Sequence, residues 1–273
     1  AWNAQLARLG EPRLRTVLAP HAPYTCSPPL LRAVVEAAHR TGAGVHLHVA
    51  EDRQQVDDSL ALYELTPVRL LASLGVFDVP GGCVAAHALV LDHGDVETLA
   101  THSVTVAHCP ITYAKLAMPV GSLRPLLDAG VDVVLGSDGV ASNGDMDLFA
   151  VVRQTALLQK LLSEDPGALP GDLPLRMATG AGARAIGFPD SGVLRVGAAA
   201  DLVLIDGDAP HLRPQHDLVA NLVHAAKGRD VTDTMVDGRW LMRDRELLTL
   251  DREKILAEAQ ARAERLLGSA GTH

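Results

Sequence analysis

A chain of 273 residues that is 48% hydrophobic and 21% charged has the composition of a globular protein, with length for one large domain and one small one. Its net charge of −9 and aromatic content of 3% argue against a nucleic-acid surface and against base-stacking platforms. Three cysteines without CxxC spacing, no signal-peptide pattern and no apolar run of bilayer length predict a cytoplasmic protein without a disulfide framework or a membrane association.

Short apolar runs alternate with helical patterns along the first two thirds of the chain, at the spacing of βα units around a parallel sheet. Residues 1–9 have the pattern of an amphipathic helix, and the chain does not open on a methionine. Five strands are expected, over residues 14–20, 44–49, 83–87, 104–108 and 131–135. The helices expected after them cover residues 28–41, 52–74 with a break near Pro67, 92–99, 123–129, 148–162 and 175–186.

The pattern changes after residue 187, where short β patterns follow one another without helices between them. They lie at residues 192–194, 200–206 and 234–241, and the last turns as a hairpin at Asp237 and Gly238. The amphipathic pattern of residues 251–267 predicts a terminal helix. The predicted organisation is a barrel portion over residues 1–187, a β-sandwich part over residues 188–245, and a C-terminal helix and tail over residues 246–273.

The fold class expected is α/β, a (β/α)8 barrel of the TIM type of which only the later strands are present. A closed barrel of eight strands needs about 250 residues. Only five strand patterns precede residue 187. The first three βα units are therefore expected to be absent from this sequence.

Each expected strand ends in a side chain that can bind a metal or move a proton. His21, His48, His87 and His108 follow the first four strands, and Asp138 follows the fifth. The carboxyl ends of parallel strands meet at one edge of a barrel, so these side chains are expected to converge there. Imidazole nitrogen and carboxylate oxygen are ligands that zinc accepts.

Residues 46–51, with the sequence HLHVAE, form the richest local motif. His46 and His48 face the same way because strand side chains alternate, and Glu51 lies in the turn beyond them. His48 at the strand tip suits a metal ligand and Glu51 suits a general acid above it. His46 lies deeper in the strand and is expected to be a packed core histidine.

Other polar residues near the strand ends have simpler expected roles. His21 lies in a proline-flanked loop and is expected to touch substrate rather than metal. Ser142 belongs to a small polar stretch that would form a pocket wall, and Asp147 is expected to cap the helix that follows. Cys109 could supply a thiolate, but a wall residue is the preferred interpretation.

Five motifs in this order resemble the amidohydrolase superfamily, most closely its methylthioadenosine/S-adenosylhomocysteine deaminase and chlorohydrolase-like branch. They are residues 21–26, 46–51, His87, residues 108–116 and residues 137–143. Residues 192–206 also resemble that family's C-terminal sandwich, and the resemblance runs from Leu14 to Leu241.

The resemblance implies that His48 and Asp138 are metal ligands and that His87 faces the metal-bound water or the substrate. It also implies that Glu51 protonates a ring nitrogen and that His21 contacts the substrate. Because His87 suits zinc by residue type as well, the predicted metal ligands are His48, His87 and Asp138, binding one divalent ion, expected to be Zn²⁺ with Fe²⁺ or Mn²⁺ as alternatives. The predicted catalytic residues are Glu51, Asp138 and His87, with no organic cofactor. The predicted substrate contacts are His21, Glu51, His87 and Ser142.

This sequence departs from the family pattern at two places. The first-strand His-x-His pair, which supplies two metal ligands in the family, is absent, and so are the arginines of the upstream region. Residues 111–113 read Ile-Thr-Tyr where the family commonly has Ser-Asn before its Lys-Leu pair. The second departure bears on the specificity of the pocket.

The function predicted is hydrolysis of a non-peptide C–N bond, specifically the deamination of an aminopurine nucleoside or a similar heterocycle. Deamination of guanine or a triazine, or dechlorination by a chlorohydrolase, are alternatives that use the same metal. An alternative of another class is a truncated, inactive metal-site fragment or pseudoenzyme. The partners expected are a small-molecule substrate and further copies of the chain in a homo-oligomer, with no nucleic acid and no membrane.

Overall fold

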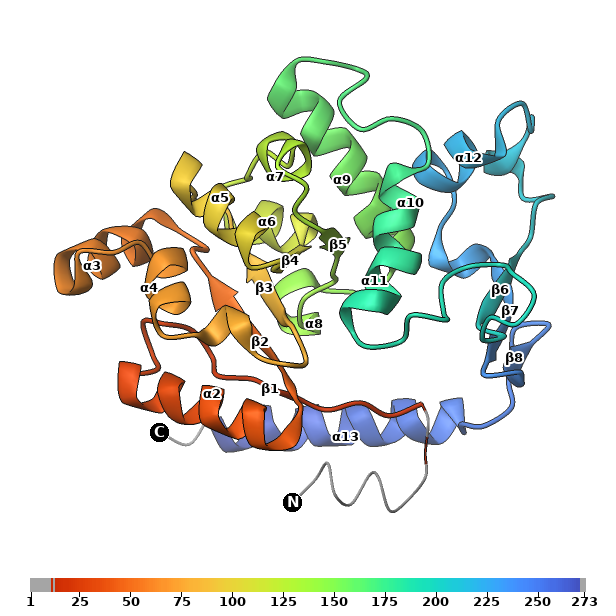
Figure 1. The fold of residues 1–273 in the computed structure, drawn as a ribbon. Coiled ribbons are helices and arrows are strands. Elements are labelled where there is room, and N and C mark those ends of the chain that lie inside the picture. The colour runs from red at the N-terminus through yellow and green to blue at the C-terminus, as the bar shows by residue number, and fades with distance from the viewer. Residues whose placement is uncertain (1–10, 12, 271–273) are drawn as a thin grey trace. The chain divides into compact units, whose positions relative to one another are not determined.

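The protein is described here from a computed structural model in which residues 11 and 13–270 are placed (Figure 1). The helix predicted over residues 1–9 lies outside the described residues. Internal contacts divide the chain into two compact units. Unit 1 comprises Ala1–Ala198 and Pro210–Gly228, and unit 2 comprises Ala199–Ala209 and Arg229–His273. The domain boundaries expected at residues 187/188 and 245/246 stay a prediction.

Unit 1 is built on a parallel sheet with the strand order β1-β2-β3-β4-β5. The strands are β1 (Val17–Leu18), β2 (Gly44–Val49), β3 (Cys83–His87), β4 (Thr105–His108) and β5 (Val133–Leu135). The register pairs Val49 with His87 and His108 with Leu135. All carboxyl ends therefore lie along one edge, and the five predicted strands are confirmed in place and order.

The helices of unit 1 follow the strands along the chain (Figure 1). They are α2 (Pro28–Thr41), α3 (Arg53–Tyr63), α4 (Pro67–Ser73), η1 (Val76–Asp78), α5 (His93–Thr101), α6 (Pro110–Leu116), α7 (Arg124–Asp128), α8 (Val140–Asn143), α9 (Leu148–Ser163), α10 (Leu173–Ala178), α11 (Gly180–Ala185), η2 (Pro210–Leu212) and α12 (Leu218–His224). A proline at the first position starts α2 and α4, where its missing N–H has no helical partner to lose. The predicted break near Pro67 is thus confirmed.

Capping residues determine where several of these helices begin or end. Gly42 ends α2 in the left-handed conformation at φ 69°, which glycine adopts without strain. Asp147 begins α9, and its Oδ1 accepts hydrogen bonds from the backbone N–H groups of Phe149 and Ala150 at 2.9 and 3.4 Å. The predicted capping role of Asp147 is confirmed, and its Oδ2 also accepts from the Gly228 N–H at 2.8 Å.

Three secondary-structure predictions were wrong. The segment after His108, where no helix was expected before residue 123, forms α6, because Pro110 starts a helical turn. The helix expected over residues 175–186 is two helices, broken at Thr179, whose φ of −114° and ψ of −101° are not helical. The strand expected at residues 192–194 is irregular, since Gly192 has φ 75°, outside the extended region. Gly192 also passes so close to the break that a Cβ on it would lie 2.6 Å from the Gly180 nitrogen.

The alternation of side chains along β2 separates a core face from an accessible face. Val45, Leu47 and Val49 are buried, and they join the main apolar cluster of unit 1. His46 is exposed and His48 is half-buried on the opposite face. The expectation that His46 packs in the core was therefore wrong. Side chains alternate along a strand, so His46 lies on the face of His48 and not on the buried face.

Unit 2 contains an antiparallel sheet in the order β6-β7-β8-β9. Its strands are β6 (Leu202–Ile205), β7 (Val231–Val236), β8 (Arg239–Arg243) and β9 (Glu246–Leu247). The helices are η3 (Gly228–Asp230), at the boundary between the units, and α13 (Arg252–Ala270). The predicted hairpin is confirmed, since Asp237 and Gly238 both have positive φ values, 50° and 72°, as a two-residue turn of this type requires.

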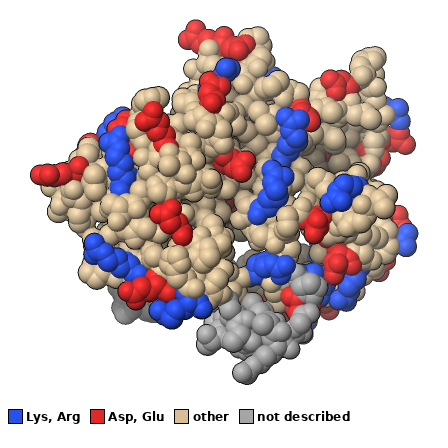
Figure 2. Space-filling view, in the orientation of Figure 1, with Lys and Arg blue, Asp and Glu red and all other residues tan. Residues whose placement is uncertain are grey.

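Charges of both signs are mixed on the face shown in Figure 2, where Lys and Arg side chains lie among Asp and Glu side chains. Arg124 pairs with Asp128 and Arg176 with Asp172 one helical turn apart, each at 2.7 Å. Such exposed pairs contribute little to stability. Among the helices that the structure describes, none is long and apolar enough to cross a membrane.

Candidate active site

His21 and His48 are joined at the carboxyl ends of β1 and β2. The His48 ring lies 4.7 Å from the His21 ring between centroids, and its Nδ1 is 2.6 Å from the His21 carbonyl oxygen. A carbonyl only accepts, so His48 Nδ1 carries the proton and donates. With Nδ1 engaged in this way, Nε2 is the ring nitrogen that faces away from the carbonyl, as in metal-binding histidines held by a backbone carbonyl.

His87 lies against His48 at the end of β3. The two rings are stacked with centroids 5.3 Å apart and an interplanar angle of 16°. His87 is buried, and burial lowers its pKa although the carboxylate of Glu51 opposes that shift. Its Nδ1 is buried without a hydrogen-bond partner among the described residues. A neutral imidazole with an unused nitrogen is the form in which histidine binds a metal.

Glu51 reaches the site from the turn after β2. Ala50 has φ 48°, and this left-handed residue turns the chain so that the Glu51 side chain lies beside His87. Glu51 Oε2 is 3.8 Å from His87 Nε2, and Glu51 Oε1 accepts a hydrogen bond from the Tyr24 hydroxyl at 3.0 Å. The Glu51 backbone N–H donates to Gln55 Oε1 at 3.3 Å. The carboxylate is thus held between two neighbours.

Asp138 lies beyond the end of β5, also in a left-handed conformation, with φ 59°. Its Oδ1 accepts a hydrogen bond from the Gly139 N–H at 2.6 Å, and its charge acts to raise the pKa of His87. Ala50, His87 (φ 77°) and Asp138 place three left-handed residues at three strand ends. Each such conformation costs about 1 kcal/mol or more, and strain of this kind clusters at functional sites.

Ser142 lies in α8, where it is half-buried. Within the described part of the chain, its side chain forms no hydrogen bond with the other five predicted site residues. Its neighbour Asn143 is buried and donates from Nδ2 to the Ser137 carbonyl at 2.7 Å, which ties α8 to the strand end that carries Asp138. The substrate contact assigned to Ser142 stays a prediction.

Tyr113 forms a buried wall behind the histidines, a role that the sequence did not reveal. Its ring meets His87 and His108 edge-on, with centroid distances of 5.6 and 5.2 Å. Its hydroxyl accepts a hydrogen bond from the Cys109 N–H at 2.7 Å. Burial lowers the pKa of His108 to about 3, and burial raises the pKa of the Cys109 thiol to about 12. The thiolate alternative for Cys109 therefore has no support, because its thiol stays protonated.

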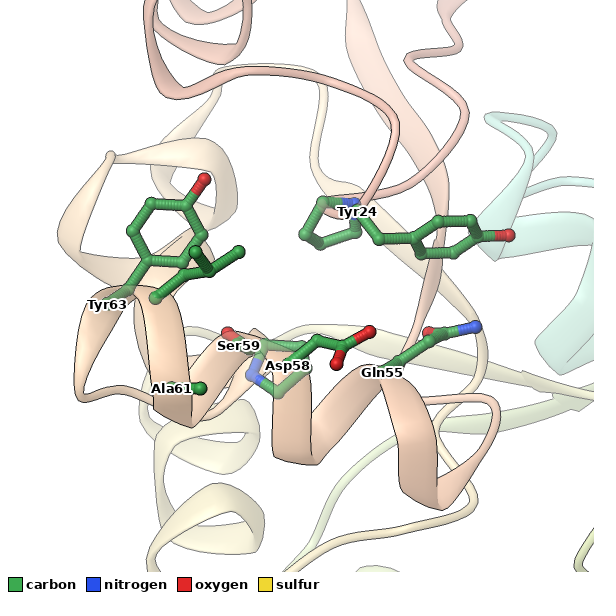
Figure 3. Close-up of a pocket in the computed structure, with 9 residues that line it drawn as sticks. Tyr24, Gln55, Asp58, Ser59, Ala61 and Tyr63 are labelled. Atoms are coloured by element: carbon green, nitrogen blue, oxygen red, sulfur yellow. The ribbon is translucent and has the colours of Figure 1, made fainter.

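Tyr24 and Gln55 are the other contacts that sequence reasoning missed. Both line a cavity of about 340 Å³ between the loop after β1 and helix α3. Figure 3 shows Tyr24 above Gln55 and Asp58 of α3, with its hydroxyl directed away from Tyr63. Tyr24 lies inside the motif of residues 21–26. That position was a signal, but nothing in the sequence indicated its hydrogen bond to Glu51.

The side chains at the strand ends fit a divalent metal by type. His48 has Nε2 facing away from the carbonyl, His87 has an unpartnered nitrogen, and Asp138 supplies carboxylate oxygen. Imidazole and carboxylate are the ligands that zinc prefers beside thiolate. However, no three His, Cys, Asp or Glu side chains of the described residues lie close enough together to hold an ion. Among the described residues, these side chains thus fit a metal by type without forming a complete set of ligands.

Parallel strands that carry imidazoles and carboxylates at their carboxyl ends, on an α/β framework, are the arrangement that enzymes of the TIM-barrel type use for their active sites. The family model described as "Amidohydrolase family" matches residues 5–241. The chain therefore belongs to the amidohydrolase family.

Similar proteins carry deaminase and chlorohydrolase names. A 5-methylthioadenosine/S-adenosylhomocysteine deaminase of Pelotomaculum thermopropionicum is 48% identical over 266 residues, which cover 97% of this chain and 60% of that protein. The crystal structure of an adenosine deaminase from Xanthomonas campestris with bound zinc matches with a TM-score of 0.92 at 35% identity, covering 98% of this chain and 61% of that one.

A more distant structure is an atrazine chlorohydrolase from Arthrobacter aurescens complexed with zinc, with a TM-score of 0.84 and 28% identity over 94% of this chain and 58% of that one. These likenesses confirm the predicted fold class. The chain spans about 60% of the length of the relatives it matches.

Proposed function

We propose that the site at the carboxyl ends of β1, β2, β3 and β5 serves the hydrolytic deamination of an aminopurine nucleoside of the 5′-methylthioadenosine class. The observation that carries the proposal is the Glu51 carboxylate, held with Oε2 3.8 Å from Nε2 of the buried His87, which stacks on His48. The deaminase name of the relative that is 48% identical supports the substrate class.

A single divalent metal, zinc first, belongs to the proposal. His48, His87 and Asp138 would bind it together with ligands from outside the described residues. When bound, such an ion lowers the pKa of a water molecule toward about 7. Zinc in two of the similar structures supports this choice over iron or manganese.

The remaining steps belong to the chain's own side chains. Asp138 accepts a proton from the water whose oxygen attacks the amino-bearing ring carbon, and His87 orients that water. Glu51 gives a proton to the adjacent ring nitrogen, so negative charge does not build up there. The C–N bond then breaks, and the proton held by Asp138 goes to the departing ammonia. The hydroxyl proton of the added oxygen returns to the Glu51 carboxylate, and the ring keeps that oxygen as a carbonyl. His21 and Ser142 would contact the substrate.

Substitution of Glu51 by Gln tests this assignment, since it keeps the shape of the side chain and removes the proton donor. General acid–base groups contribute about 100-fold to 10,000-fold, so the turnover number should fall by at least about 100-fold. Zinc content by elemental analysis should stay unchanged, because Glu51 is not a proposed ligand. Activity retained by the Glu51→Gln variant would remove Glu51 from the role of acid.

Dechlorination of a triazine is a second candidate reaction, and the likeness to the atrazine chlorohydrolase favours it. The same water attack would then expel chloride in place of ammonia. A panel of 5′-methylthioadenosine, adenosine, guanine and a chlorinated triazine separates the two. Release of chloride with no release of ammonia would replace deamination by dechlorination.

An incomplete site without turnover is the candidate of another class, favoured by the finding that no three possible ligands in the described residues group together. About one zinc ion per chain in the elemental analysis would contradict it. No bound zinc, with no turnover of any compound in the panel, would establish it. A homo-oligomer stays part of the proposal.

A further inference from the structure

Tyr24 connects two residues of the candidate site. Its hydroxyl donates a hydrogen bond to Glu51 Oε1 at 3.0 Å. Its ring meets the His21 ring edge-on, with centroids 5.6 Å apart and an interplanar angle of 78°. The side chain thus bridges the loop after β1 and the turn after β2, although it was not among the predicted site residues.

The two oxygens of the Glu51 carboxylate have different surroundings. Oε1 is occupied by the Tyr24 hydroxyl, whereas Oε2 lies 3.8 Å from Nε2 of His87. The Glu51 side chain is only 16% exposed, so little water competes for either oxygen. Its backbone is fixed by the left-handed Ala50 and by the bond to Gln55. Rotation of the carboxylate would break the Tyr24 hydrogen bond.

This asymmetry favours one oxygen for a proton on Glu51. A proton on Oε1 would compete with the hydrogen that the Tyr24 hydroxyl donates there, and the hydroxyl would have to rotate and accept instead. A proton on Oε2 leaves that bond intact. Burial, together with the adjacent Glu51, raises the pKa of Tyr24 to about 12, so the phenol remains a donor at neutral pH.

We propose that Tyr24 is a positioning residue that engages Glu51 Oε1 and thereby places the transferable proton on Oε2, the oxygen on the His87 side. The proposal rests on the proposed function, in which Glu51 is the proton donor. Tyr24 acts through Glu51 and moves no proton itself. Its ring, which lines the cavity shown in Figure 3, is needed only to hold the hydroxyl in place.

Steady-state kinetics of Tyr24→Phe with 5′-methylthioadenosine test the proposal in the zinc-supplied protein. Loss of this hydrogen bond to Glu51 should lower kcat by about 10-fold, with KM within about 2-fold and zinc content unchanged. Tyr63→Phe is the matched control, because Tyr63 lines the same cavity and its hydroxyl has no hydrogen bond within the described ranges. The control should keep its kcat.

Three kinetic results would overturn the proposal. An unchanged kcat in Tyr24→Phe would mean that the hydroxyl does not position the acid. A raised KM with unchanged kcat would make Tyr24 a wall of the substrate pocket. A fall in kcat in Tyr63→Phe as large as that in Tyr24→Phe would assign the effect to the cavity as a whole.

A titration without substrate separates this proposal from the proposed function. The chain has only three tyrosines, so the ultraviolet difference between the wild type and Tyr24→Phe isolates the ionisation of Tyr24. In Glu51→Gln the midpoint should move down toward the ordinary value of about 10. An unchanged midpoint would overturn the contact, whether or not the enzyme turns over. A shifted midpoint in a protein inactive on the whole panel would leave the contact standing and overturn the proposed function, and with it the catalytic purpose of Tyr24.

Discussion

Replacing Tyr113 by Phe removes one oxygen from the centre of unit 1 and tests the account of the wall behind the histidines. Tyr113 has no exposed surface, and its hydroxyl accepts the Cys109 N–H at 2.7 Å. The phenylalanine ring would keep the edge contacts with His87 and His108, so no large cavity forms. The Cys109 N–H would be left buried without a partner, which costs about 1–3 kcal/mol.

That loss is a large share of a total stability of about 5–15 kcal/mol. Urea unfolding followed by circular dichroism should show a lower midpoint with an unchanged slope. Hydrogen exchange by mass spectrometry should be faster in the peptide that contains Cys109. Tyr63→Phe is the control, with an expected change of less than about 0.5 kcal/mol, typical of a surface site. A Tyr113→Phe variant as stable as this control would refute the reasoning.

Two further predictions follow from buried titratable groups. Burial lowers the pKa of His108 to about 3, whereas in the unfolded chain its pKa is about 6.5. Between these two pH values the unfolded chain binds a proton that the folded protein does not bind. The contribution of the neutral His108 to the free energy of unfolding is therefore fully present above about pH 6.5 and is lost as the pH falls toward 3. The loss should be about 1 kcal/mol per pH unit, and a His108→Leu variant with the same pH dependence as the wild type would contradict it. Because burial raises the pKa of the Cys83 and Cys109 thiols to about 12, neither should react with iodoacetamide in the folded protein at about pH 8, whereas both should react in urea. Peptide mass spectrometry measures this, and native labelling of Cys109 as fast as in urea would restore the thiolate interpretation.

The sequence by itself determined the order of the strands and the identity of the residues at their ends. Side chains alternate between the two faces of a strand, so the sequence alone placed His46 and His48 on the same face of β2. The sequence also predicted the hairpin at Asp237 and Gly238 and the helix cap at Asp147. Each of these features is made by residues that are neighbours in the chain. The site histidines were found because each follows an apolar run.

Tertiary structure alone decided which of these side chains touch. The bond from Tyr24 to Glu51 spans 27 positions of the chain, and the stack of His87 on His48 spans two strands, so no local pattern encodes either. The break between α10 and α11 lies against Gly192, a residue from a later loop. Local propensity sets the elements and their faces, whereas the direction of a hydrogen bond or the burial of a ring depends on what the rest of the chain brings beside it. For this reason the types of the site residues were predictable, and the asymmetry of the two oxygens of Glu51 was not.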